Sequence, residues 1–448
     1  MKINHTFRYI LLIAFSLSLN SCKDFLDVQP QSSVSDDQTI VDETSAKTAT
    51  RGMYRQLASD SYYGSLFQSI GYLSGDNIVW TGSQSIIQDF INHDVKSDNG
   101  NIATVWSGIY ETINRANHII AKVPLVTDES FTEAERNALL GEAYFVRGLC
   151  YFDLARTWGG VQIVLTPTVS ATDKNGIKRS SLADTYAQVL ADLTKAETLL
   201  TNTTNRYRAT QKTARALLAR YYLYQENWAQ AEAYADKVLG DTDYELVKPY
   251  SAFFSNQAVA TKESVFELAY SSTYTNGHRT YWQPPANGGT RQWAPNATFI
   301  SLVSDENVGG NRSALIAKTT AGLWYGNMYY RSPATDPAFV IRIAELYLIR
   351  SEARAHQDKL ADALDDLNAI RDRAGLSDSP AQTQEEILLA IENERRLEFA
   401  FEPHRWFDLV RTHRVEAVLG VTNTNKYVLP IPITEVTVDE SLEQNTGY

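Results

Sequence analysis

The sequence predicts a mainly α-helical protein, in which a helical-repeat scaffold carries long, irregular and partly β-stranded insertions. Apolar residues recur at the spacing of a helix face in the two stretches assigned to the scaffold, residues 102–240 and 341–412. Residues 241–340 are instead dense in glycine and proline, which excludes long helices there. Residues 61–101 have a similarly loop-rich composition. We therefore expect function to lie on these two insertions.

The clearest helix start lies at Thr132. Thr132 and Glu135 have the spacing of a capping box, in which each satisfies a backbone N–H of the other residue. Apolar residues then follow on one helix face until the glycine pair that begins at Gly159. Ser181, followed by Asp184, offers the N-cap of a second helix. The sequence thus predicts two long helices in the first part of the scaffold.

Two pairs of shorter helices are expected farther along the chain. Residues 211–225 and 228–239 form the first pair, and residues 341–356 and 360–374 form the second, which Gly375 closes. The second helices have corresponding apolar positions, namely Trp228, Ala231, Ala235 and Val238 against Leu360, Ala363, Leu367 and Ile370. Antiparallel pairs with small contact residues are typical of tetratricopeptide-type repeats, which gain a core by stacking.

Composition and motifs exclude several function classes. Lys plus Arg total 41 against 53 for Asp plus Glu, and the net charge of −12 disfavours binding to nucleic acid. The sequence contains no HExxH, GxSxG, GxGxxG or phosphate-loop motif, and its seven histidines lack paired metal spacing. We expect no cofactor and no metal. The 25 tyrosines and 8 tryptophans are a surplus suited to flat, half-polar binding surfaces.

The N-terminus has the features of a processing segment. Positive charge precedes a short apolar run over residues 10–19, which as a helix rises only about 15 Å, half of a bilayer core. Residues 1–21 are therefore predicted to be a signal peptide, with Cys22 as the lipid attachment site and residues 22–41 as anchor and tether. An ordinary signal peptide cut near Ser21, with Cys22 incidental, is the alternative. Residues 42–448 are expected to form a single domain.

A cluster of carboxylates near the C-terminus raises the alternative of a glycoside hydrolase. Glu394, Glu398 and Glu402 follow one another at intervals of four residues, and His404 lies nearby. A glycosidase requires two carboxylates that face each other across a cleft. In this segment the carboxylates alternate with arginines along an amphipathic helix. The pattern favours an inward glutamate held by arginine, and the chain is expected not to be an enzyme.

Aromatic residues in the two insertions are the predicted binding residues. Aromatic faces stack on the C–H surfaces of sugars, while a polar side chain takes up hydroxyl groups. An alternative is that these aromatic residues only fasten long loops to the scaffold. The candidate ligand-binding residues are Asn77, Trp80, Tyr281, Trp282, Trp293 and Trp324.

A family resemblance extends over the whole mature chain. The segments that carry it include "CKDFLDVQPQ", "ATRGMYRQL", "GEAYFVRGLCYFDLARTWGGVQIV", "AELYLIRSEARA", "ENERRLEFAFEPHRWFDLVRT" and the closing "YVLPIPITEV". In these segments the chain resembles the SusD/RagB family of Bacteroidota surface lipoproteins. The resemblance implies a tetratricopeptide-like scaffold with an elaborate insertion, on a lipoprotein of the outer membrane that faces the cell exterior.

The resemblance also implies a function and partners. Family members bind glycans, or in some cases peptides, and pass them to a SusC-like TonB-dependent transporter, and they are not enzymes. The predicted function is thus capture of an oligosaccharide and its delivery to such a transporter, with a peptide ligand as the alternative. Ligand residues vary between family members, so the resemblance itself assigns no ligand residue in this chain.

Overall fold

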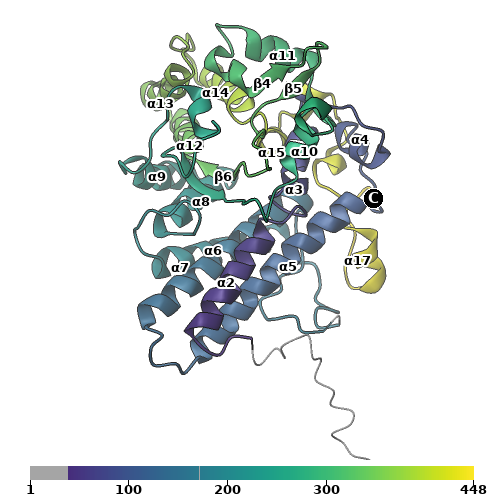
Figure 1. Cartoon of the computed structure of the whole chain (residues 1–448), viewed down its shortest axis with the longest axis vertical. Coiled ribbons are helices and arrows are strands. Elements are labelled where there is room, and N and C mark those ends of the chain that lie inside the picture. The colour runs from purple at the N-terminus through teal and green to yellow at the C-terminus, as the bar shows by residue number, and fades with distance from the viewer. Residues whose placement is uncertain (1–38, 171) are drawn as a thin grey trace, which may run out of the picture.

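The computed structural model describes residues 39–170 and 172–448, so the predicted signal peptide, Cys22 and most of the tether lie outside the described part. One end of the molecule consists of long helices packed side by side (Figure 1). These are α2 (Glu43–Leu57), α5 (Gly100–Lys122), α6 (Glu133–Trp158) and α7 (Leu182–Leu199). Helix α2 precedes the range predicted for the scaffold, and it packs against α5 and α6.

The predicted caps of α6 and α7 are confirmed. The N–H of Glu135 donates to Oγ1 of Thr132 at 3.3 Å, and the N–H of Thr132 donates to the Glu135 carboxylate at 3.1 Å. Gly159, with a φ of +81°, ends α6 in a backbone conformation that favours glycine. Oγ of Ser181 accepts from the N–H of Asp184 at 3.0 Å at the start of α7. Local side-chain chemistry therefore sets these helix boundaries.

The two predicted helix pairs are present. They are α8 (Gln211–Tyr224) with α9 (Trp228–Leu239) and α12 (Ile343–His356) with α13 (Leu360–Arg373). The corresponding alanines of the second helices, Ala231 and Ala363, are buried, and Gly375 has the expected positive φ of +76°. Helix α12 begins two residues later than predicted because the preceding residues belong to a strand. The pairs stack through contacts of α12 with α8 and α9.

Six short strands form antiparallel pairs in the described residues. The pairs are β1 (Ile78–Trp80) with β3 (Trp293–Pro295), β2 (Ser264–Leu268) with β6 (Ala338–Arg342), and β4 (Ile316–Lys318) with β5 (Trp324–Gly326). Strands β2 and β6 come from near the two ends of the segment 241–340. Their pairing therefore closes the long insertion at its base, next to the start of α12.

The expectation of an irregular segment over residues 61–101 is wrong in part. This segment contains helices α3 (Leu66–Leu73) and α4 (Ser85–Ile91), and most of α3 is buried. The hydroxyl groups of Tyr62 and Tyr63 both donate to the Asp153 carboxylate of α6, at 2.6 and 2.8 Å. The composition suggested irregular loops, but the apolar side chains of α3 are buried in the core.

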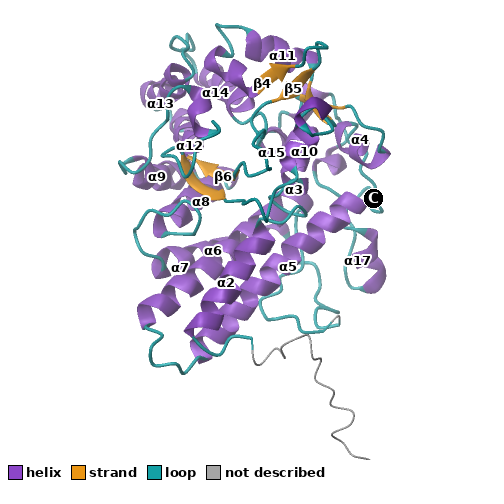
Figure 2. Ribbon diagram, viewed as in Figure 1, coloured by secondary structure: helices purple, strands orange, loops and turns teal. Residues whose placement is uncertain are grey.

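The remaining helices are α10 (His278–Trp282), α11 (Ala297–Ser304), α14 (Gln384–Glu398), α15 (Arg405–Arg411), α16 (Val415–Leu419) and α17 (Ile433–Val438). Figure 1 shows α10, α11, β4 and β5 at the end opposite the long helices, whereas α17 lies beside α5. Figure 2 shows how much loop connects these elements. Within residues 39–170 and 172–448, no helix is long and apolar enough to span a bilayer.

Candidate ligand-binding site

The two insertions meet at the sheet of β1 and β3. Trp80 of the first insertion is the cross-strand partner of Trp293 in the second. The pairing continues beyond the strands, where the N–H of Thr81 donates to the carbonyl of Gln292 at 2.9 Å. Segments far apart in the sequence therefore supply one shared region that holds the predicted aromatic residues.

Two of the predicted binding tryptophans are buried. Trp282 and Trp293 are both 0% exposed. Trp282 packs against Phe401 and Tyr72, with ring centroids 4.3 and 5.4 Å away, and lies edge-on to Trp293 at 5.7 Å. The expectation that these rings are exposed loop platforms is wrong, because their faces are covered by other aromatic side chains. They fasten the second insertion to the core, as the alternative interpretation stated.

Asn77 is also buried, at 1% exposure, and holds the loop before β1 in place. Its Oδ1 accepts from Nε of Arg396 at 2.8 Å, and its Nδ2 donates to the Arg396 carbonyl at 3.1 Å. The preceding Asp76 accepts from Arg405 at 2.7 and 3.0 Å. Burial raises the pKa of Asp76, but the guanidinium groups of Arg405 and Arg396 outweigh burial and lower it. The expectation that Asn77 faces a ligand is therefore wrong in this structure.

Three predicted residues keep part of their aromatic surface accessible, namely Trp80, Tyr281 and Trp324. Tyr281 stacks on Trp293 with centroids 4.3 Å apart. Strand β5, which carries Trp324, packs against β3, and Nε of Arg291 donates to the Trp324 carbonyl at 2.7 Å. We call Trp80, Tyr281 and Trp324 the aromatic surface.

Positively charged side chains and a close glycine accompany the aromatic surface. Nζ of Lys318 lies 5.1 Å from the centroid of the Trp324 ring, within the range of a cation–π contact. Gly82 lies so near the indole of Trp80 that an added Cβ would come within 2.2 Å of a ring carbon. A side chain at position 82 would therefore displace the Trp80 ring.

The carboxylates proposed as an alternative catalytic group lie inside an ion-pair network. Glu398 pairs with Arg342 at 2.8 Å and with Arg312 at 3.0 Å, and Glu402 pairs with Arg342 at 2.6 Å. Glu394 pairs with Arg312 at 2.7 Å. All three glutamates are at most 4% exposed. The prediction of an inward glutamate held by arginine is confirmed, and the carboxylates do not face each other across an open cleft.

The arginines of this network come from other parts of the chain. Arg312 belongs to the second insertion and Arg342 to β6, whereas the sequence pattern pointed to arginines beside the glutamates in α14. Burial by itself raises the pKa of Glu398, but the guanidinium groups of Arg373, Arg342 and Arg312 outweigh it and lower the pKa to about 2. Ion pairs of the network therefore tie the insertion to α13 and α14.

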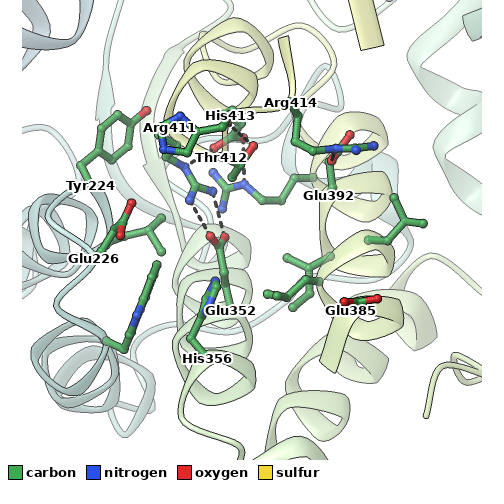
Figure 3. A pocket seen from close by; sticks show the side chains of 17 residues that line it. Tyr224, Glu226, Glu352, His356, Glu385, Glu392, Arg411, Thr412, His413 and Arg414 are labelled. Carbon is green, nitrogen blue, oxygen red and sulfur yellow. Dashed lines mark hydrogen bonds and ion pairs between the residues drawn. The ribbon is translucent and has the colours of Figure 1, made fainter. Parts of the chain in front are cut away.

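A separate cavity of about 460 Å³ lies between the repeat helices and the C-terminal helices, away from the predicted residues. Figure 3 shows Glu352 and His356 of α12 at its centre and Arg411, Thr412 and His413 beyond them. The ring of His356 stacks on that of Trp228 at 4.0 Å. Neither ring was among the residues predicted to bind a ligand.

A helical-repeat scaffold with an aromatic surface built from two insertions defines a class of binding protein, and comparison with known proteins identifies the family. Residues 24–223 match the family model described as "Starch-binding associating with outer membrane", and residues 304–420 match that of the SusD family. The chain belongs to the SusD/RagB family, whose members are binding proteins.

Individual relatives match along nearly the whole chain. The SusD-like protein P38 of Formosa agariphila is 24% identical, with 99% of both chains covered. The structure of a SusD superfamily protein from Bacteroides vulgatus has a TM-score of 0.82 at 22% identity, covering 91% of this chain and 99% of that one. A laminarin-binding SusD-like protein has a TM-score of 0.80 at 23% identity, covering 91% and 100%. These similarities confirm the predicted helical fold.

Proposed function

We propose that this protein captures an oligosaccharide at the aromatic surface and delivers it to a SusC-like TonB-dependent transporter. The observation that carries the proposal is that Trp80, Tyr281 and Trp324 remain partly accessible while the neighbouring Trp282 and Trp293 are buried. The buried pair fixes the positions of the accessible rings. Rigid, preplaced aromatic faces lose little conformational entropy when a sugar stacks on them.

The chemistry of the surface favours a sugar ligand. The accessible side chains are amphipathic rings, and the cations beside them, Arg291 and Lys318, offer N–H donors for hydroxyl oxygens. A family described as starch-binding and a laminarin-binding structural neighbour are consistent with a neutral glucan or a related glycan. Ligand stacking on each ring contributes roughly 1–3 kcal/mol, the scale of burying a large apolar side chain.

The proposal includes attachment to the outer membrane. Cys22 would carry the lipid, and residues 22–41 would tether the domain so that it faces the cell exterior. A tethered binder does not itself move a ligand across a membrane, so a transporter partner completes the route. Gentle detergent extraction followed by pull-down at native expression is expected to recover a large β-barrel partner. Recovery of the protein alone would contradict this part of the proposal.

The binding experiment begins with a glycan array and a peptide panel, followed by calorimetry with the best ligand. Tyr281→Ala and Trp80→Ala are each expected to weaken binding by about ten- to a hundredfold, the equivalent of about 1–3 kcal/mol. Tyr144→Ala is the matched control, because Tyr144 is a partly exposed tyrosine on α6, outside both insertions. Selection of a peptide as best ligand, or normal binding by both variants, would overturn the assignment.

A further inference from the structure

The cavity of Figure 3 has the size and lining of a small-ligand site. Its volume of about 460 Å³ falls within the range of roughly 300–1,000 Å³ that is typical of ligand pockets. Its apolar lining includes Leu223, Trp228, Leu388, Leu389 and Ile391. Leu389 is 48% exposed, so part of this apolar lining is open to solvent. The apolar part of a ligand of matching size would be stabilised in the cavity, because it would remove these side chains from water.

The charges within the cavity are mostly neutralised. Each of three carboxylates is paired with arginine at 2.5–2.9 Å, namely Glu352 with Arg411, Asp408 with Arg395 and Arg411, and Glu392 with Arg414. Each of these arginines has a carboxylate partner, although Nη1 of Arg395 is buried without a hydrogen-bond partner. The cavity floor is therefore an internal salt-bridge network in which the charges of the acidic and basic side chains largely cancel.

Two further carboxylates lie at the rim. Glu226 follows α8 in the turn to α9, and Glu385 lies in the first turn of α14. Figure 3 shows them on opposite sides of Glu352 and His356. Both are exposed, and no ion pair involves either of them within residues 39–170 and 172–448. The uncompensated charge of the cavity is therefore negative and placed around an apolar interior.

His356 does not offset this charge at neutral pH. Burial lowers the pKa of its imidazole, which faces Glu352, Arg411 and Glu226 and stacks on Trp228. The ring is consequently neutral near pH 7, and a cation that enters the cavity meets no additional positive charge from it. Tyr224 and Trp228 add aromatic surface to the lining, and the Arg411 guanidinium carbon already lies 5.7 Å from the centroid of the Tyr224 ring.

We propose that this cavity binds an aliphatic ammonium ion, with the apolar chain against the leucines and the ammonium group at Glu226 or Glu385. A free diamine and the lysine side chain of a peptide share this chemistry. The site is separate from the aromatic surface, so it does not depend on the proposed glycan binding. An alkyl chain without charge would lack the rim contacts, and a dicarboxylate would be repelled by them.

Calorimetry at low ionic strength tests the proposal with hexamethylenediamine and with Nα-acetyl-lysine amide. Saturable binding of at least one probe with millimolar or better affinity is expected, and stronger binding of the first or of the second identifies a free amine or a lysine side chain as the source. The neutral hexanediol and the anion adipate are expected to bind at least tenfold more weakly. Binding is also expected to weaken as salt is added.

Variants of the two rim carboxylates test whether the amine binds in this cavity. The double variant Glu226→Gln with Glu385→Gln retains the size of both side chains and is expected to reduce affinity at least tenfold. Glu129→Gln, which neutralises an exposed carboxylate in the loop before α6, is the control and is expected to change nothing. The indole resonance of Trp228, assigned with Trp228→Phe, is expected to shift on titration. No saturable binding of either amine up to about 10 mM, equal binding of hexanediol, or an unaffected double variant would overturn the proposal.

Discussion

The ring of Tyr281 lies on that of Trp293, with centroids 4.3 Å apart and planes 24° from parallel. Tyr281 is half-buried, whereas Trp293 is completely covered. One ring of the stack therefore faces outward and the other belongs to the core. This relationship separates a ring proposed to bind a ligand from a ring that supports it, and the two rings lead to different expectations.

Trp293→Ala is expected to destabilise the fold by about 3–5 kcal/mol, because it removes a fully buried tryptophan and leaves a cavity beneath Tyr281. Urea unfolding measures the change. Tyr281→Ala is the comparison and is expected to have a much smaller effect on stability. A Trp293→Ala protein as stable as the native protein would show that the second insertion is not fastened by this ring.

Gly82→Ala is expected to reduce glycan affinity by about tenfold with little change in the urea midpoint. The added Cβ would meet the Trp80 indole at 2.2 Å, so the ring must turn away from its position on the aromatic surface. Calorimetry with the ligand found by array measures the effect. Unchanged affinity together with a displaced Trp80 ring would show that Trp80 does not contact the ligand.

Glu394→Gln is expected to destabilise the protein by about 3–5 kcal/mol, because it leaves the guanidinium of Arg312 buried with one fewer anionic partner. Denaturant unfolding tests this expectation, with the exposed Glu129→Gln as control. If the native protein cleaves a glycan, and the variant keeps its stability but loses cleavage, the segment is catalytic. The protein would then be a glycoside hydrolase and not only a binding protein.

Acid is expected to weaken the fold through Glu398. Its pKa is lowered from 4.5 to about 2 in the folded protein, so the folded state binds the proton less readily than the unfolded chain. The stabilisation is complete above about pH 4.5 and is lost as the pH falls toward about 2. Urea unfolding across this range measures the slope. Glu398→Gln should show a flatter dependence, and an identical slope would contradict the assignment.

Cys22→Ala is expected to release the protein from the membrane into the periplasm. The short apolar run that ends at this single cysteine motivates the prediction, and stable anchoring generally requires two or more acyl chains. Fractionation and surface protease accessibility measure the outcome. A variant that stays membrane-bound and surface-exposed would exclude lipid attachment at Cys22.

Local sequence signals predicted the scaffold well. The capping box at Thr132, the cap at Ser181 and the positive φ of Gly375 all depend on residues within a few positions, and each is present. Helix pairs also followed from apolar spacing alone. These features were predictable because neighbouring side chains and backbone groups determine them.

The site was less predictable because burial depends on residues far away in the sequence. Nothing near Trp282 indicates that Phe401 and Tyr72 cover its ring, and nothing near Glu398 points to Arg312. Composition likewise predicted a loop-rich segment over residues 61–101, although this segment contains α3, which is largely buried. An aromatic residue in a glycine-rich segment can be a binding platform or a fastener, and only its tertiary contacts decide between them.

A crystal structure of the complex with the oligosaccharide identified by array would show directly whether the aromatic surface is the binding site. We expect a sugar ring stacked on at least one of Trp80, Tyr281 and Trp324, with the buried Trp282 and Trp293 unmoved. A glycan bound elsewhere on the molecule, with these three rings free of contact, would contradict this expectation.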